Sequence, residues 1–387
     1  MEKYKILFLG SGLCEWGGGI DYLCQIVSAY SYLARHTDDV KIEMSAIIPF
    51  IDTSIVDDKE RKEILISNLL KIEPSIRIYY LSQNESLKEK IIQMHPDFVM
   101  PYCCGAFRNF SIPYISYIPD FQEEYYKQYF SSVVIVARRQ VNAFILSYAP
   151  YVIATSNSVA LDIKKFYPKC RSHIFIQPFA PLSCCEYWNT SHVDLTKYEL
   201  PDKYFIVSNQ FWMHKDHLTI FRAVKLLLEN GYKDIFVVCT GKMEDYRSTS
   251  YNEELKKFIS ENSLEKNIKL LGYISKLEQI EIMKNAIALI QPTQFEGDPG
   301  GCSVYEAISY GKSVIMSDIL VNLEASGTED VYYFKVGDSK DLALKMILLL
   351  KKTYKPYKVE IVERIFERNV KIITKFYMDI MKYVVKR

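Results

Sequence analysis

The sequence has no strong net charge and no long apolar run. Its 48 Lys and Arg residues nearly balance 47 Asp and Glu residues, which leaves a formal charge of +1. A near-neutral chain has no general attraction for nucleic acid. No stretch approaches the roughly 18 apolar residues that a membrane-spanning helix needs. The run Ile6–Leu9 is too short for a secretory leader and instead predicts a first strand.

Cysteine is present, but without a pattern that predicts disulfides or a zinc site. The nine cysteines include two adjacent pairs, Cys103–Cys104 and Cys184–Cys185, and no Cys-x-x-Cys array. Adjacent cysteines are poorly placed to form a disulfide or to share a metal ion. We therefore expect free thiols and a cytoplasmic protein.

Metal-binding and dinucleotide-binding motifs are missing as well. The chain has six histidines, and its aspartate pairs Asp38–Asp39 and Asp57–Asp58 are adjacent rather than spaced as Asp-x-Asp. Gly10 and Gly12 follow the first strand, but the third glycine of the dinucleotide fingerprint would fall at Glu15. The sequence predicts no bound metal and no cofactor, and it argues against a Rossmann dehydrogenase.

Strand-like apolar runs alternate with helical periodicity through both halves of the 387-residue chain. This alternation predicts parallel sheets with helices on both faces. Ser183–Asp202 has no period, and we interpret it as a linker. The expected division is residues 1–195, residues 196–365 and a C-terminal helix over 366–387. The predicted strands are Ile6–Leu9, Val40–Ile48, Ile76–Leu81, Phe98–Pro101, Ile112–Ile118, Tyr151–Thr155, Tyr204–Val207, Ile235–Cys239, Ile268–Leu271, Ala286–Gln291 and Ser313–Ser317.

The most informative segment is a glycine-rich loop between two glutamates, Glu296 and Glu306. Residues 295–308 read Phe-Glu-Gly-Asp-Pro-Gly-Gly-Cys-Ser-Val-Tyr-Glu-Ala-Ile. Glycines allow a backbone to approach a ligand closely, and a helix N-terminus offers N–H groups to an anion such as a diphosphate. We expect Glu306 to open the helix and to accept hydrogen bonds from ribose or sugar hydroxyls. The segment therefore predicts a sugar-nucleotide site at the end of a parallel sheet.

This segment resembles the donor-site motif of GT-B glycosyltransferases of the retaining family 4 type. The family's two glutamates lie closer together than Glu296 and Glu306, which nine residues separate here. Asp298 stands at the usual spacing, so either the loop is longer or Asp298 replaces the first glutamate. The resemblance implies that Glu306 holds the ribose and that Glu296 or Asp298 holds donor-sugar hydroxyls. It also implies donor contacts from Gly300, Gly301, Cys302 and Ser303.

The loop Ser208–His217 contains a lysine, Lys215, directly after a predicted strand. A cation there can offset the negative charge that develops on a diphosphate leaving group. In the resembled family this loop carries an arginine and a lysine. Lys215 matches the lysine, whereas the arginine position falls at Asn209 or Gln210, which are uncharged. Three residues are candidates to replace the arginine: His214, Lys242 and Arg247.

Further donor contacts are expected from turns that follow strands. By position and by resemblance, the turns Thr240-Gly241-Lys242 and Gly272-Tyr273-Ile274 would contact the base and ribose. Glycine is common in turns that follow strands, so each motif alone is weak evidence for a binding site. The resembled family also has an N-terminal Gly-Gly loop that faces the donor phosphates. The residues that fit this role are Gly17, Gly18 and Gly19.

The segment Tyr117–Gln122 resembles the Ile-Pro-Asp-Phe-Gln segment of family 4 enzymes that build bacterial surface polysaccharides. Asp120 is our candidate for orienting an acceptor or donor hydroxyl. The alternative is a turn aspartate that caps a helix. The nearby residues Tyr125, Tyr126 and Tyr129 could stack on a sugar face or simply pack.

The last segment, Asn369–Arg387, predicts a basic amphipathic helix. Its apolar face contains Val370, Ile373, Phe376 or Tyr377, Ile380, Met381 and Val384. Its basic face contains Lys371, Lys375, Lys382 and Lys386. The resemblance implies that this helix packs back on the N-terminal domain, and a membrane-surface role is the alternative.

The resemblance implies an α/β protein of GT-B fold, with two Rossmann-like domains whose parallel sheets face a central cleft. It implies a metal-independent, retaining glycosyltransferase that uses a nucleoside diphosphate sugar and no cofactor. The acceptor would be a glycan or lipid-linked glycan, as in O-antigen and other polysaccharide biosynthesis, and the protein would contact the inner membrane face peripherally. The catalytic residues would be Lys215, Glu296 and Asp120. Two alternatives stay open, a sugar-nucleotide epimerase on the same scaffold and a non-catalytic sugar-nucleotide-binding protein.

Overall fold

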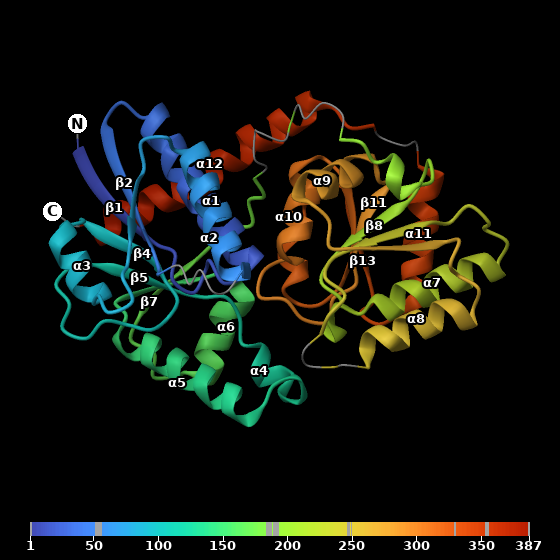
Figure 1. Cartoon of the computed structure of the whole chain (residues 1–387), viewed down its shortest axis with the longest axis horizontal. Coiled ribbons are helices and arrows are strands. Elements are labelled where there is room, and N and C mark those ends of the chain that lie inside the picture. The colour runs from blue at the N-terminus through green and yellow to red at the C-terminus, as the bar shows by residue number, and fades with distance from the viewer. Residues whose placement is uncertain are drawn as a thin grey trace. The chain divides into compact units, whose positions relative to one another are not determined.

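The computed structural model describes residues 2–50, 56–182, 188, 193–245, 248, 250–328, 330–352 and 356–385. The chain forms two compact units (Figure 1). Unit 1 contains residues 1–121, 132–178 and 370–387, and unit 2 contains residues 122–131 and 179–369. Parts of the expected linker Ser183–Asp202 lie outside the described residues, and so do Cys184, Cys185, Arg247 and Lys386.

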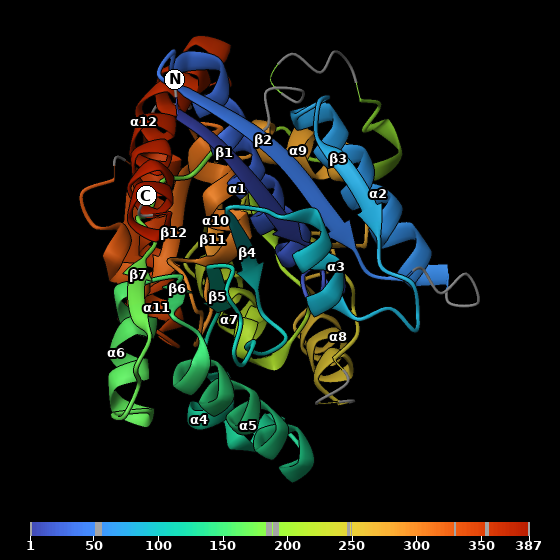
Figure 2. The ribbon, with the colours of Figure 1, turned by 90° about the vertical axis from the view of Figure 1, so that its left-hand side faces the viewer.

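Unit 1 contains a seven-stranded sheet in the order β3-β2-β1-β4-β5-β6-β7, and neighbouring strands pair in parallel. Its strands are β1 (Glu2–Leu9), β2 (Val40–Ile48), β3 (Arg77–Tyr80), β4 (Phe98–Tyr102), β5 (Tyr114–Ile118), β6 (Tyr151–Ala154) and β7 (His173–Ile176). Its helices are α1 (Gly17–His36), α2 (Val56–Ile72), α3 (Leu87–Met94), α5 (Ser132–Tyr148) and α6 (Asn157–Phe166). Figure 2 shows the long strands β1 and β2 side by side.

Unit 2 contains a six-stranded parallel sheet in the order β10-β9-β8-β11-β12-β13. Its strands are β8 (Phe205–Ser208), β9 (Val237–Thr240), β10 (Ile268–Gly272), β11 (Ala288–Gln291), β12 (Ser313–Ser317) and β13 (Val331–Phe334). Its helices include α4 (Gln122–Tyr125), α7 (His217–Glu229), α8 (Tyr251–Glu261), α9 (Lys276–Asn285), α10 (Gly301–Ser309) and α11 (Ser339–Lys351).

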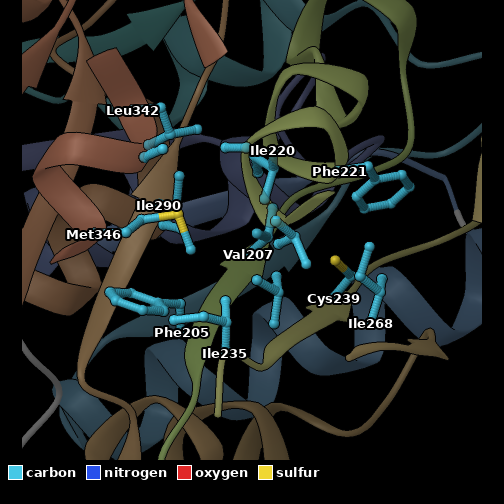
Figure 3. Packing of buried hydrophobic residues seen from close by; sticks show 14 of the residues in the cluster. Phe205, Val207, Ile220, Phe221, Ile235, Cys239, Ile268, Ile290, Leu342 and Met346 are labelled. Atoms are coloured by element: carbon cyan, nitrogen blue, oxygen red, sulfur yellow. The ribbon is translucent and has the colours of Figure 1, made fainter. Parts of the chain in front are cut away.

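An apolar core packs α7 and α11 against the sheet of unit 2. Phe205 and Ile290 from the sheet, Ile220 from α7 and Met346 from α11 are fully buried in this cluster (Figure 3). The β-branched and aromatic residues of β8 suit a buried parallel strand. The core therefore fixes where β8 and β11 end, and the loops that follow these strands carry the predicted residues Lys215 and Glu296.

The last helix, α12 (Val359–Val384), begins in unit 2, and its residues from Val370 onward belong to unit 1. It starts ten residues before the predicted start at Asn369, because polar and apolar residues already alternate with helical period from Val359. The predicted apolar face is buried, and Tyr377 rather than Phe376 is its fully buried aromatic residue. The Tyr377 ring lies 5.3 Å from the ring of Tyr30.

The prediction of two α/β halves with parallel sheets is confirmed. The predicted bounds of β2 and β12 match the structure, and most other predicted strands lie within two residues of the observed bounds. The described residues contain no helix that is both long enough and apolar enough to span a bilayer.

Candidate functional site

The candidate site of unit 2 lies where the strand order reverses. Successive strands run outward from β8 to β10 on one side and from β11 to β13 on the other. Ligands of open parallel sheets bind at such a switch point, beyond the carboxyl ends of the strands. The loop after β8 carries Lys215, and the loop after β11 carries Glu296, so the topology brings these two predicted residues together.

Lys215 and Glu296 form an ion pair between Nζ and Oε1. Their side chains are only 13% and 11% exposed. Lys215 ends a short 3₁₀ turn, and Asp216 then takes φ 51° and caps α7 by accepting a hydrogen bond from the Thr219 amide. The cap fixes the start of α7 and thereby the direction of Lys215. A charge pair this shielded from water interacts more strongly than a surface pair.

Two buried amide side chains, Asn209 and Gln291, form a chain of hydrogen bonds that ends on Glu296. Asn209 Nδ2 donates to Gln291 Oε1 at 2.5 Å, and Gln291 Nε2 donates to Glu296 Oε1 at 3.2 Å. Gln291 Nε2 also reaches the carbonyl oxygen of Gly300 at 2.5 Å. Asn209 thus supports the site through Gln291, while Gln210 is exposed. Gln291 was not predicted as a site residue. The available signal was its position as a polar residue at the end of a buried strand.

The N-terminus of α10 begins earlier than predicted. Glu306 was expected to open this helix, but α10 starts at Gly301 and Glu306 is its sixth residue. The reason is that Gly300 adopts φ 72°, which a glycine accepts without strain, and the helix can start directly after it. The Gly300 amide donates to Asn322 Oδ1 at 2.8 Å, so it is already used within the protein.

The first turn of α10 contains the predicted donor residues Gly301, Cys302 and Ser303. The first N–H groups of a helix have no acceptor within the helix and can bind an anion. A Cβ atom at Gly301 would lie 3.3 Å from Glu296 Oε2, so the backbone runs close beneath the glutamate. Cys302 is exposed, and Ser303 Oγ lies 3.5 Å from Asn209 Oδ1.

Glu306 lies in a second polar network at the ends of β8 and β9. It forms an ion pair with Lys276, and its Oε2 accepts a hydrogen bond from Gln279 Nε2 at 3.0 Å. The same Gln279 nitrogen donates to Ser208 Oγ at 2.7 Å, and Thr240 Oγ1 donates to Ser208 Oγ at 3.1 Å. Lys276 and Gln279 belong to α9 and were not among the predicted site residues.

The glycine turns after β9 and β10 meet through their backbones. The Gly241 amide donates to the Gly272 carbonyl at 2.8 Å. A Cβ atom at Gly241 would lie 2.0 Å from the Asn209 carbonyl oxygen, so a larger residue does not fit beside this loop. Lys242 pairs with Glu244 at 2.9 Å, and Tyr273 is 81% exposed. Ile274 packs against the core.

The remaining predicted residues fall into two groups. Within unit 2, the two candidates for the family's first glutamate differ in their contacts. The backbone carbonyl of Asp298 accepts a hydrogen bond from the Gly301 amide at 3.4 Å, whereas the Glu296 carboxylate forms the ion pair with Lys215. Within unit 1, Asp120 forms an ion pair with Arg138 at 2.7 Å. Three predicted residues of unit 1 form the first turn of α1: Gly17, Gly18 and Gly19.

Comparison with known proteins gives a family match over part of the chain and a shared fold. Residues 194–367 match the model of the family described as glycosyl transferases group 1. No curated protein matches the chain significantly in sequence.

Several solved structures share the fold at low sequence identity. A glycosyltransferase from Rickettsia africae is 16% identical with a TM-score of 0.64, and each chain is covered completely. Sucrose-phosphate synthase from Thermosynechococcus elongatus is 15% identical with a TM-score of 0.67, over 98% of this chain and 100% of that one. Anabaena Alr3699/HepE in complex with UDP-glucose is 16% identical with a TM-score of 0.64, over 97% and 99% of the two chains.

These similarities fit the observed pair of parallel sheets and show a GT-B fold with two Rossmann-like units. The family match covers most of unit 2, including Lys215, Glu296 and Glu306. The match of residues 194–367 to the glycosyltransferase group 1 model, together with the shared fold, supports a GT-B glycosyltransferase.

Proposed function

We propose that this protein transfers a sugar from a nucleoside diphosphate sugar to an acceptor hydroxyl, with retention of configuration at the anomeric carbon. The observation that carries the proposal is the shielded Lys215–Glu296 pair at the switch point of unit 2, next to the first turn of α10. The cation and the backbone N–H groups suit the diphosphate of the donor, and the carboxylate suits hydroxyls of its sugar.

The donor would lie along the carboxyl edge of the sheet. The diphosphate would meet Lys215 and the first turn of α10, because both present positive charge. The ribose hydroxyls would donate to Glu306, whose carboxylate Lys276 and Gln279 already orient. Anabaena HepE was solved with UDP-glucose, so uridine diphosphate sugars are the first donors to test.

In the proposed reaction the bond between the anomeric carbon and the phosphate oxygen breaks as the acceptor oxygen bonds to the same face of the carbon. The departing phosphate takes the proton of the acceptor hydroxyl, so no protein base is needed. The Lys215 ammonium offsets the negative charge that develops on that phosphate. Glu296 would accept hydrogen bonds from hydroxyls of the donor sugar, and Asp120 of unit 1 would orient a hydroxyl.

The proposed reaction uses no metal ion. The described residues hold no group of three or more His, Cys, Asp or Glu side chains that could bind one, and Lys215 supplies a positive charge for the leaving group. Activity should therefore survive EDTA, and a strict requirement for a divalent metal would contradict this part of the proposal.

The proposed acceptor is a glycan or a lipid-linked glycan at the inner membrane face, as in surface-polysaccharide biosynthesis. The lipopolysaccharide outer core galactosyltransferase WaaB shares the fold at 16% identity and a TM-score of 0.55. The basic face of α12 would provide the membrane contact.

A non-catalytic sugar-nucleotide-binding protein is the second candidate. The position of the family's arginine falls at Asn209 or Gln210, which are uncharged, and Asn209 hydrogen-bonds to Gln291 and Ser303, so of the expected pair of cations only the lysine is matched, by Lys215. A sugar-nucleotide epimerase would instead convert the donor without an acceptor.

A two-stage experiment separates these functions. A thermal-shift screen against nucleoside diphosphate sugars should identify the donor, because a ligand that binds the folded state raises its melting temperature. Incubation of that donor with and without a lipid extract then follows nucleotide release. A transferase releases nucleoside diphosphate with the extract, an epimerase changes the sugar without it, and a binding protein does neither.

A further inference from the structure

One segment of the first half of the chain belongs to unit 2. Residues 122–131 are part of unit 2, although the residues on both sides of them, up to Phe121 and from Ser132, belong to unit 1. The segment contains α4 and a 3₁₀ turn, Lys127–Tyr129. It begins two residues after Asp120, the candidate for orienting an acceptor or donor hydroxyl. The chain thus leaves unit 1, contributes ten residues to unit 2 and returns.

Tyr126 makes both a hydrogen bond and ring contacts between this segment and the rest of unit 2. Its hydroxyl donates to the carbonyl oxygen of Gln294 at 3.1 Å. Its ring meets the edge of Phe295 at 5.9 Å and stacks on Tyr129 at 5.3 Å. Burial, and then Tyr129 and Asp216, raise the pKa of Tyr126 above its ordinary value. The hydroxyl therefore keeps its proton at neutral pH and remains a donor.

The carbonyl that Tyr126 binds belongs to the loop between β11 and Glu296. The Gln294 amide donates to the His214 carbonyl at 2.8 Å, and Thr293 Oγ1 reaches the same oxygen at 3.3 Å. His214 precedes Lys215, and Gln294 lies two residues before Glu296. Thr293 and Gln294 therefore connect the backbones of the two loops that carry the ion pair. Tyr126 binds the Gln294 carbonyl oxygen of this connection.

We propose that Tyr126 is a positioning residue for the Lys215–Glu296 pair. Its hydrogen bond fixes the Gln294 peptide, which fixes the approach of Glu296 to Lys215. The role in sugar transfer rests on the proposed function, whereas the effect on the pair does not. The Tyr126 hydroxyl thereby connects residues 122–131 with the loop that carries Glu296.

Tyr126→Phe tests the proposal because it removes the hydroxyl and keeps the ring that packs on Phe295 and Tyr129. The matched control is Tyr80→Phe, the same change at the end of β3, where Tyr80 is 52% exposed. Brief labelling with acetic anhydride, read by mass spectrometry, reports how well Lys215 is shielded. Lys284 and Lys312, only 3% and 5% exposed in unit 2, report general loosening of that unit.

In Tyr126→Phe we expect Lys215 to label about threefold faster, with Lys284 and Lys312 unchanged. Without the Tyr126 hydrogen bond, the Lys215–Glu296 ion pair should open more often and expose the Lys215 amine to the reagent. With a donor that supports turnover, kcat should fall about tenfold while the KM for the donor changes less than about twofold. This is the pattern expected when a positioning contact is lost. Tyr80→Phe should match the wild type in both measurements.

An unchanged Lys215 labelling rate in Tyr126→Phe overturns the proposal. So does a parallel rise at Lys284 and Lys312, because the hydroxyl would then only stabilise unit 2 as a whole. If the wild type transfers sugar from no donor, the proposed function fails, and the labelling result still decides the role of Tyr126.

Discussion

Lys276 at the start of α9 and Glu306 in the middle of α10 form an ion pair at the carboxyl edge of the second sheet. Gln279, one turn after Lys276, donates to the other oxygen of the same carboxylate at 3.0 Å. The carboxylate is therefore held on both oxygens by one helix, and each oxygen retains lone pairs for further hydrogen bonds. We therefore propose this carboxylate as the acceptor for a pair of neighbouring ribose hydroxyls.

Glu306→Gln should weaken nucleotide binding about tenfold or more, because hydrogen bonds to a charged acceptor are stronger than those to a neutral amide. Isothermal titration calorimetry with the nucleotide found in the thermal-shift screen measures this effect. Glu253→Gln on α8, whose side chain is 73% exposed, is the control and should bind as the wild type does. Equal affinity in both variants would mean that Glu306 does not contact the nucleotide.

Much of the fold could be predicted because apolar runs of strand length determine a parallel sheet. Val40–Ile48 was predicted with its observed bounds, since its apolar residues end at a clear turn signal. The start of α10 was predicted wrongly because Pro299, Gly300 and Gly301 look like a loop, whereas Gly300 with φ 72° is the N-cap and the helix starts at Gly301.

The charged residues of the candidate site could be predicted from the sequence. Lys215, Glu296 and Glu306 stand out as charged residues in loops or helices that follow apolar strands. Gln279 and Gln291 did not, because a neutral amide becomes informative only when its partners are known. The membership of residues 122–131 in unit 2 depends on long-range packing, for which a single sequence holds no local signal.

Gly241→Ala should destabilise unit 2 by about 3 kcal/mol or more, since the added methyl meets backbone that cannot move aside. Gly241 has φ 137°, and its Cβ would lie 2.0 Å from the Asn209 carbonyl oxygen. Gly231→Ala is the matched control, because Gly231 also has positive φ, 86°, but open space around it. Urea unfolding compares the two. Similar costs would show that backbone strain alone, rather than the contact with Asn209, requires glycine.

Stability should fall as pH drops because of His217, whose ring is fully buried and stacks on Phe211 at 4.2 Å. Burial, and then the charge of Lys215, lower the pKa of His217 from 6.5 to about 3. The unfolded chain binds a proton below about pH 6.5 and the folded chain does not, so at pH 5 this group lowers the free energy of unfolding by about 2 kcal/mol.

His217→Phe keeps the stacked ring and removes this titration. The difference in unfolding free energy between pH 7.5 and pH 5, measured with urea, should shrink by about 2 kcal/mol relative to the wild type. An unchanged pH dependence in the variant would contradict the assignment of a neutral, buried His217.

The basic face of α12 should bind anionic membranes. Its apolar face is buried, with Tyr377 against Tyr30, while Lys371, Lys375 and Lys382 are exposed. Each lysine near an anionic surface contributes about 1 kcal/mol of attraction. Replacing these three and Lys386 with glutamine should reduce sedimentation with anionic vesicles at low salt and leave donor binding intact. If the wild type does not sediment with such vesicles, the helix only joins the two units.

Nucleotide release by wild type and Lys215→Ala tests the central claim most directly. With the donor and a lipid extract that support turnover, Lys215→Ala should be slower by about a hundredfold or more, because the loss of one group that stabilises developing charge costs about 3 kcal/mol. Lys225→Ala, the same change at an exposed position of α7, should retain the wild-type rate. Wild-type turnover by Lys215→Ala would contradict the account, because the leaving group would then depart without the one charge assigned to it.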